Sequence, residues 1–128
     1  MLISYEGGQK FIAESRGHRV VVDLPPDLGG TDSGMMPPEL LAASLGSCVG
    51  VYVANYLNKS GISTEGLNIE VSYEKEDKPS ARINSLNVKV NLPAEVPEDR
   101  HQAIMVVAKQ CLIHNTLHNP PEVKIELV

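Results

Sequence analysis

The amino-acid sequence predicts an α+β protein, a single domain over residues 1–128 whose elements follow the order β-β-β-α-β-β-α-β. Three observations predict this class. Glycine turns separate short apolar runs near the N-terminus, two stretches carry apolar residues at helical spacing, and others alternate apolar and polar residues. A chain of 128 residues, 42% of them hydrophobic, can bury a core without a disulfide scaffold.

Three short strands are expected between residues 2 and 24. The Gly7–Gly8 turn precedes the run Phe11–Ala13, and Gly17 precedes the run Val20–Val22, which favours a small meander. The next residues, 25–38, hold four prolines and three glycines and are typical of a connecting loop.

The first helix is expected from Pro38 to Ser60. Proline is tolerated in the first helical turn, Glu39 complements the positive end of the helix dipole, and Gly61 supplies a stop. Between Glu39 and Lys59 lie 19 uncharged residues, a length that could just cross a bilayer. Serine, glycine and asparagine dilute this stretch, so it is interpreted as a buried helix of a soluble chain and not as a membrane span.

A hairpin follows this helix. Apolar residues alternate with polar ones over Leu67–Tyr73, and a partner strand runs from Ile83 to Leu92 after the charged turn Lys75–Ser80. The polar face of the hairpin is expected to be solvated.

A second helix and a last strand complete the predicted order. Pro97 and two acidic residues mark the helix start, and apolar residues at three- and four-residue spacing predict one buried stripe that includes Cys111. The Asn119–Pro121 segment ends this helix, and the alternation of Val123, Ile125 and Leu127 predicts a final strand.

Composition excludes several classes of function. The net charge of −5 argues against a protein that follows nucleic-acid phosphates, and one Phe with no Trp leaves few side chains for base stacking. The N-terminus has neither a basic segment nor a long apolar segment, so no signal peptide is expected and the predicted location is the cytoplasm. No glycine pattern for nucleotide phosphates is present.

The two cysteines are the candidate chemical groups. Cys48 and Cys111 lie 63 residues apart. Two cysteines are too few for a secreted disulfide framework, and their spacing is too wide for a four-ligand zinc knuckle. Small residues flank Cys48 on both sides, which indicates either a close packing partner or room for a substrate. A free cysteine can also be a small buried hydrophobic residue without chemistry.

A reactive Cys48 needs a group from elsewhere in the protein. A thiol reacts as the thiolate, burial raises the pKa of a thiol, and Cys48 lies too deep in its helix for the dipole to help. A cation or a hydrogen-bond donor must therefore come from another element; the candidates are Lys10, Arg16, Arg19, Arg82 or a second subunit. Alternatively, Cys48, Cys111 and His114 could hold a metal ion in a sensor.

Two segments carry a family resemblance. The run from Pro38 to Cys48 (PELLAASLGSC) and the later run from Cys111 to Leu117 (CLIHNTL) resemble the OsmC/Ohr family, more its broader OsmC-like branch than the typical Ohr or OsmC subgroups. The lead-in from Asp23 to Gly34 is also similar, so the resemblance covers nearly the whole chain. It implies intertwined homodimers in which two central helices pack against antiparallel sheets.

The resemblance also implies a chemistry and a set of roles. The implied chemistry is that of thiol peroxidases, which reduce organic hydroperoxides in the stress response. Dithiols such as lipoylated proteins recycle these enzymes. Cys48 would attack the peroxide and become a sulfenic acid, and Cys111 would resolve it to a disulfide. Arg19 and Glu39 are the matches for the activating arginine and glutamate. The family glutamate lies ten residues before the cysteine, whereas Glu39 lies nine before Cys48.

No metal or organic cofactor is implied, and neither nucleic acid nor membrane is an expected partner. The alternative function is a catalytically inactive OsmC-like dimer that binds a small hydrophobic ligand beside its two helices, with both thiols as core residues.

Overall fold

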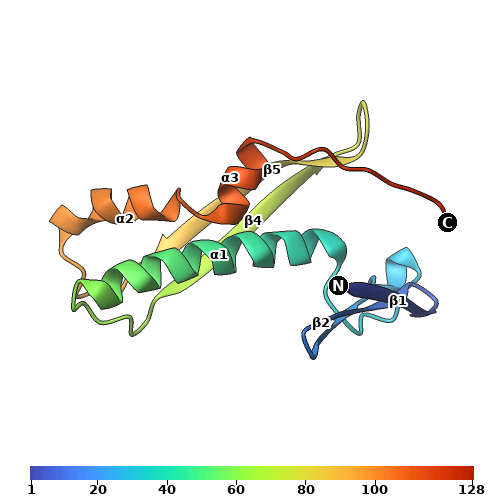
Figure 1. Ribbon diagram of the computed structural model, residues 1–128, viewed down its shortest axis with the longest axis horizontal. Helices are drawn as coiled ribbons and strands as arrows, with labels where there is room; N and C mark the ends of the chain where they lie inside the picture. Colours follow the sequence, from blue (N-terminus) through green and yellow to red (C-terminus); the bar gives the residue numbers. More distant parts are fainter. The chain divides into compact units, whose positions relative to one another are not determined.

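The computed structural model describes all 128 residues. Figure 1 shows its elements, which are β1 (Leu2–Gly7), β2 (Lys10–Ser15), β3 (His18–Val22), α1 (Pro37–Lys59), β4 (Asn68–Glu76), β5 (Arg82–Asn91), α2 (His101–Ala108) and α3 (Leu112–His118). Short 3₁₀ turns, η1 (Pro26–Leu28) and η2 (Glu98–Arg100), precede α1 and α2. The chain divides into two compact units, Met1–Leu41 and Ala42–Val128. The α+β class is confirmed.

The N-terminal unit contains the predicted meander. Strands β1, β2 and β3 pair in this order and are antiparallel, with Ile12 opposite Val21 across the second pair. Gly7 and Gly8 form the first turn, with φ values of 103° and 58° that glycine adopts without strain. Ile12 is the buried hydrophobic residue of this sheet, and most of the other side chains are exposed.

The loop after β3 is ordered around one carboxylate, which the sequence analysis did not anticipate. Asp23 is 1% exposed and accepts hydrogen bonds from the backbone N–H groups of Leu24, Thr31 and Ser33, at 2.8, 3.1 and 3.1 Å. The hydroxyl groups of Thr31 and Ser33 donate to the same carboxylate at 2.7 and 2.8 Å. Gly30 allows this turn, because a Cβ atom there would overlap the carbonyl oxygen of Leu24.

Those donors determine the ionisation of Asp23. The hydroxyl of Thr31 has the largest effect and, with the other donors, holds the pKa of the Asp23 carboxyl far below its usual range in spite of burial. The carboxylate therefore stays charged at neutral pH and organises residues 23–33 of the loop.

Helix α1 lies within one residue of its predicted bounds at each end. The Glu39 carboxylate accepts a hydrogen bond from the backbone N–H of Met36 at 2.7 Å, which caps the helix start. At the other end Gly61 adopts φ +69° and the N–H of Ile62 donates to the Leu57 carbonyl at 3.0 Å.

Helix α1 buries one stripe. Leu45, Val49, Val53 and Leu57 recur every four residues and belong to the core of the second unit. By length and composition α1 could cross a membrane, but the core helices of soluble proteins can have the same length and composition. Here its buried stripe packs in one core with residues of β5 and α2.

The predicted hairpin is confirmed as β4 and β5, with Val71 opposite Val88. Its alternation holds, because Ile69, Val71 and Tyr73 are half-buried while the residues between them are exposed. Gly46 of α1 explains one of the small residues beside Cys48: a Cβ atom at Gly46 would lie 2.8 Å from a Val71 methyl group. At Gly46, the small residue serves close packing of the hairpin on α1.

The prediction of one continuous second helix was wrong. Helix α2 ends at Ala108, α3 begins at Leu112, and Cys111 between them is extended, with φ −53° and ψ 132°. The N–H groups of Gln110 and Cys111 donate to the carbonyls of Val107 and Ala108, three residues back, so the helix tightens and ends. The apolar spacing continues across the break because Ile104 and Cys111 enter the same core.

The predicted final strand is absent. Residues 119–128 are irregular, and Val123, Ile125 and Leu127 are 79%, 87% and 99% exposed. A strand forms only where another strand supplies hydrogen-bond partners, and no strand of this chain pairs with the tail. The alternating pattern alone could not provide that partner.

Candidate thiol site

The structure brings Cys48 and Cys111 together. Cys48 lies in the middle of α1 and is half-buried, while Cys111 is fully buried immediately before α3. Both are free thiols, and they lie close enough for each to shift the pKa of the other. The break between α2 and α3 places Cys111 before a free helix start, a feature that the sequence analysis missed.

The start of α3 supplies the donors. The first N–H groups of a helix have no partner within the helix. Here the N–H groups of Leu112 and Ile113 lower the pKa of the Cys48 thiol. The N–H of His114 donates to the Cys111 Sγ at 3.4 Å, and the N–H of Asn115 donates to the Cys111 carbonyl at 3.0 Å. The free N–H groups of α3 are thus directed at the two sulfurs.

The pKa values of the two thiols are shifted in opposite directions. Burial acts to raise the pKa of Cys48, but hydrogen bonds from the Cys111 thiol and from the N–H groups of Ile113 and Leu112 outweigh it and leave this pKa below its usual value. Burial raises the pKa of Cys111, and its hydrogen bond to Cys48 raises it further. Cys48 is therefore the thiol that ionises first, with Cys111 as its proton-bearing neighbour.

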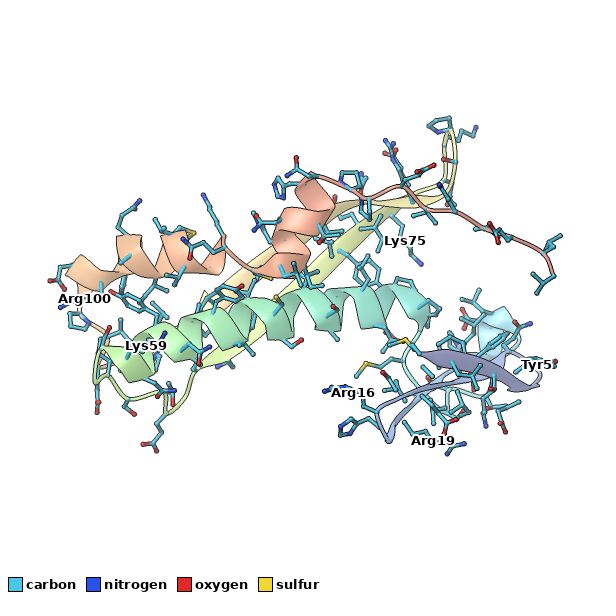
Figure 2. All side chains as sticks on the ribbon, viewed as in Figure 1. Tyr5, Arg16, Arg19, Lys59, Lys75 and Arg100 are labelled. Atoms are coloured by element: carbon cyan, nitrogen blue, oxygen red, sulfur yellow. The ribbon has the colours of Figure 1, made fainter.

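The donors that lower the pKa of Cys48 are not cations. Figure 2 shows Arg16 and Arg19 extending from the N-terminal sheet, Arg16 at a turn with φ 51° and Arg19 exposed on β3. Among the other candidates, Lys10 begins β2, and Arg82 forms an ion pair with Glu76 on the neighbouring strand at 2.5 Å. The hydrogen-bond donors that the sequence analysis required come from α3.

Glu39 already has a local partner. It lies nine positions before Cys48 on α1, and its carboxylate holds the Met36 N–H at 2.7 Å. The activating roles of Arg19 and Glu39 remain predictions from the resemblance.

The alternative metal site is not assembled. No group of three His, Cys, Asp or Glu side chains in the structure could hold a metal ion. His114 contacts Cys111 through its backbone N–H, and its ring Nδ1 is buried without a hydrogen-bond partner. The residues present therefore do not fit a metal held by Cys48, Cys111 and His114.

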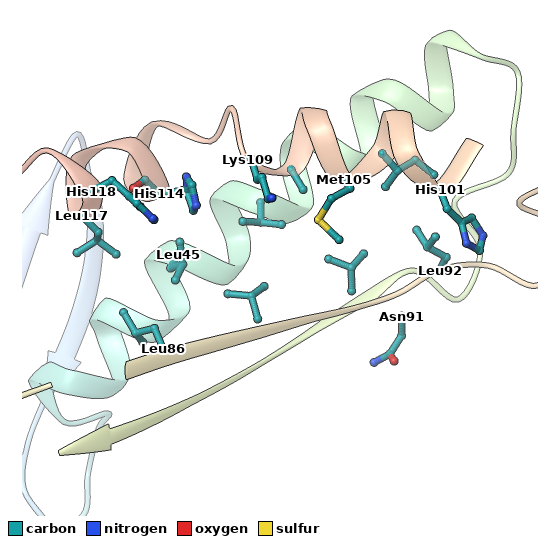
Figure 3. A pocket seen from close by; sticks show the side chains of 15 residues that line it. Leu45, Leu86, Asn91, Leu92, His101, Met105, Lys109, His114, Leu117 and His118 are labelled. Atoms are coloured by element: carbon teal, nitrogen blue, oxygen red, sulfur yellow. Dashed lines mark hydrogen bonds between the residues drawn. The ribbon is translucent and has the colours of Figure 1, made fainter. Parts of the chain in front are cut away.

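A cavity of about 870 Å³ lies in the second unit, between α1, β5, α2 and α3 (Figure 3). Ten of its fifteen lining residues are apolar, among them Leu45 and Val49 of α1 and Leu86 of β5. Neither cysteine lines it, although His114 does. Its volume lies within the usual range of about 300–1,000 Å³ for small-molecule sites.

Comparison with known proteins identifies the family. The model of the OsmC-like protein family matches residues 30–126, so the chain belongs to the OsmC-like family. No curated protein matches this sequence.

Solved structures share the fold. A Psychrobacter arcticus protein is 20% identical over 90% of this chain and 85% of its own, with a TM-score of 0.82. The OsmC-like protein of Mycoplasma pneumoniae is 21% identical over 87% of this chain and 80% of its own, with a TM-score of 0.75. The organic hydroperoxide resistance protein OsmC of Legionella pneumophila is 18% identical over 91% and 87%, with a TM-score of 0.69. These likenesses confirm the OsmC-like fold expected from the resemblance.

Proposed function

We propose that this protein is a thiol peroxidase that reduces organic hydroperoxides through Cys48 and Cys111. The observation that carries the proposal is the adjacency of the two thiols at the start of α3, with a lowered pKa for Cys48 and a raised one for Cys111. Membership of the OsmC-like family and the likeness to hydroperoxide resistance proteins support it.

The first step oxidises Cys48. Its thiolate attacks the terminal oxygen of the hydroperoxide, the O–O bond breaks, and the organic part leaves as an alkoxide that takes a proton to become an alcohol. The sulfur becomes a sulfenic acid, the reversible first stage of cysteine oxidation. The N–H groups of Leu112 and Ile113 favour this step because they stabilise the attacking thiolate.

The second step uses Cys111. Its sulfur attacks the Cys48 sulfenic acid, hydroxide leaves with the Cys111 proton as water, and a disulfide forms. The adjacency of the two side chains favours this reaction over further oxidation by a second peroxide. An external dithiol, such as a lipoylated protein, then reduces the disulfide and restores both thiols. The cycle needs neither a metal nor an organic cofactor.

We further propose that the protein works in the cytoplasm as a homodimer, without nucleic acid or membrane partners. The chain exposes seventeen large hydrophobic residues and buries only nine hydrophobic ones, which leaves much apolar surface for a second copy to cover. The exposed, alternating tail residues Val123, Ile125 and Leu127 suit pairing with a strand edge of that copy. From the family resemblance we also propose activating roles for Arg19 and Glu39.

Peroxide consumption tests the function. The reduced protein is mixed with cumene hydroperoxide and dihydrolipoamide, and the remaining peroxide is measured with time. We expect catalytic consumption, a Cys48–Cys111 disulfide by peptide mass spectrometry in the absence of reductant, and loss of consumption in Cys48→Ser. Equal rates for Cys48→Ser and the wild type would contradict the proposal.

The cavity supports a second candidate function, the binding of a small hydrophobic ligand. Its apolar lining and its volume of about 870 Å³ are those of a ligand site. This function predicts a ligand that remains bound in native mass spectrometry and needs no cysteine chemistry.

A further inference from the structure

The polar residues that line the cavity have an unusual charge pattern. The chain has 16 acidic residues against 11 basic ones, yet none of the acidic residues lines the cavity. Its polar lining consists of Asn91, Lys109 and three of the four histidines of the chain, His101, His114 and His118. Although the protein is acidic overall, only neutral and basic polar groups line this apolar cavity.

These groups are arranged around the apolar floor. Figure 3 shows His114 and His118 together at one end beside Leu117, His101 at the other end, and Lys109 between them. The two rings at the first end have centroids 4.2 Å apart and planes tilted by 35°. Lys109 forms no salt bridge, so its ammonium group is available to an incoming anion.

Charge decides which ligand suits this space. Lys109 and the absence of acidic residues from the lining favour a ligand with a negative charge. The side chain of His114 also lines the cavity, but its Nδ1 atom is buried and forms no hydrogen bond.

We propose that this cavity binds an amphipathic anion, a carboxylate with an aliphatic chain, whose chain lies on the floor formed by α1 and β5 and whose head group contacts Lys109. This proposal gives a chemical class to the ligand of the second candidate function. It does not depend on the peroxidase proposal, because neither cysteine lines the cavity.

The test compares three ligands with the same ten-carbon chain and different heads. Decanoate, 1-decanol and decyltrimethylammonium are titrated below their micelle concentrations into the reduced wild-type protein, and heat is measured by calorimetry. We expect decanoate to bind about tenfold more tightly than the alcohol, because one charge-assisted contact distinguishes the two ligands. The cationic ligand should bind more weakly than the alcohol. Equal affinity for the anion and the alcohol would overturn the proposal.

Variants locate the site. Lys109→Met should weaken decanoate binding about tenfold without changing decanol binding, because the side chain is exposed and only its charge is lost. Lys89→Met is the matched control, since Lys89 lies on β5 outside the cavity lining and should bind decanoate like the wild type. A larger loss in the Lys89 variant than in the Lys109 variant would overturn the assignment.

Two further measurements separate this proposal from others. Val88→Trp, which fills the cavity, should abolish binding of both decanoate and decanol, with folding checked by circular dichroism. Cys48→Ser should bind decanoate as tightly as the wild type even if it consumes no peroxide, so the two proposals fail separately. A protein dimer that shows no decanoate in native mass spectrometry would indicate that a second copy fills the cavity, and would overturn the proposal.

Discussion

In two regions of this protein, hydrogen-bond donors surround an acidic group, with different consequences. In the N-terminal unit, five hydrogen bonds converge on the buried Asp23 carboxylate. In the second unit, two backbone N–H groups and a thiol converge on the half-buried sulfur of Cys48. In both regions the donors lower the pKa of the acceptor.

The difference lies in the ordinary pKa of each acceptor and in its exposure. A carboxyl group is already ionised at neutral pH, so donors around Asp23 add only stability. A thiol ionises near pH 8.5, so donors that lower the pKa of Cys48 change how much thiolate exists at neutral pH. Because Cys48 is also partly exposed, the lowered pKa can support a reaction there.

Removing the acceptors gives the largest expected effects. Cys48→Ser should lower the rate of peroxide consumption by about a thousandfold or more, since the nucleophile itself is lost, without a comparable loss of stability. Stopped-flow peroxide assays and thermal unfolding measure the two quantities. A Cys48→Ser variant that unfolds instead of losing activity would show that this cysteine is a core residue.

The Asp23 loop should respond in the opposite way. Asp23→Ala leaves the donors of Thr31 and Ser33 without their acceptor and should destabilise the N-terminal unit, while thiol reactivity stays unchanged. Limited proteolysis of residues 1–41 and thermal unfolding measure the loss. Asp27→Ala, on the exposed turn η1, is the control and should behave like the wild type.

Low pH should reproduce part of this loss of stability. Because the pKa of Asp23 is lowered in the folded state, its contribution to the free energy of unfolding is present above the unfolded pKa of about 3.9 and is lost as the pH falls towards the folded pKa. Urea unfolding at pH 7 and pH 3 should show a smaller drop in stability for Asp23→Ala than for the wild type. An equal drop would assign acid sensitivity to other carboxyl groups.

A single backbone donor can be removed from the thiol site. Leu112 is the first residue of α3, its side chain is exposed, and the preceding Cys111 is extended, as a residue before proline prefers. Leu112→Pro should therefore keep α3 but lose one N–H donor to Cys48, raising the pKa of Cys48. Iodoacetamide alkylation at pH 7 should slow about three- to tenfold, because one hydrogen bond to an ion contributes about one pKa unit.

Leu112→Ala is the matched control, since it removes the same side chain and keeps the N–H group. Its alkylation rate should equal that of the wild type. Equal slowing in both variants would mean that the leucine side chain, and not the backbone donor, controls Cys48.

The smallest effect is expected at the capping carboxylate. Glu39→Gln should destabilise the protein by about 0.5 kcal/mol, because a partly exposed cap near a helix start is weakened and not lost. The alkylation rate of Cys48 should change less than threefold, since α3 already lowers its pKa. A much larger change in rate would give Glu39 the activating role that the family resemblance implies.

The local elements followed from sequence patterns that report local physics. Proline, glycine and periodicity predicted the meander, α1 and the hairpin because those signals act within a few residues. Two predicted elements were wrong. The continuous apolar spacing concealed the break at Cys111, and the alternating tail predicted a strand that pairs with no other strand of this chain.

The sequence by itself determined the α+β class, the family and the two sulfur atoms, because composition, periodicity and motifs are properties of the chain alone. Only the tertiary structure decided what surrounds those sulfurs. The donors to Cys48 are backbone N–H groups freed where α3 begins, and no residue type signals them, because every residue except proline carries the same group. The Asp23 turn escaped prediction for the same reason, since its donors become available only when the loop closes around the carboxylate.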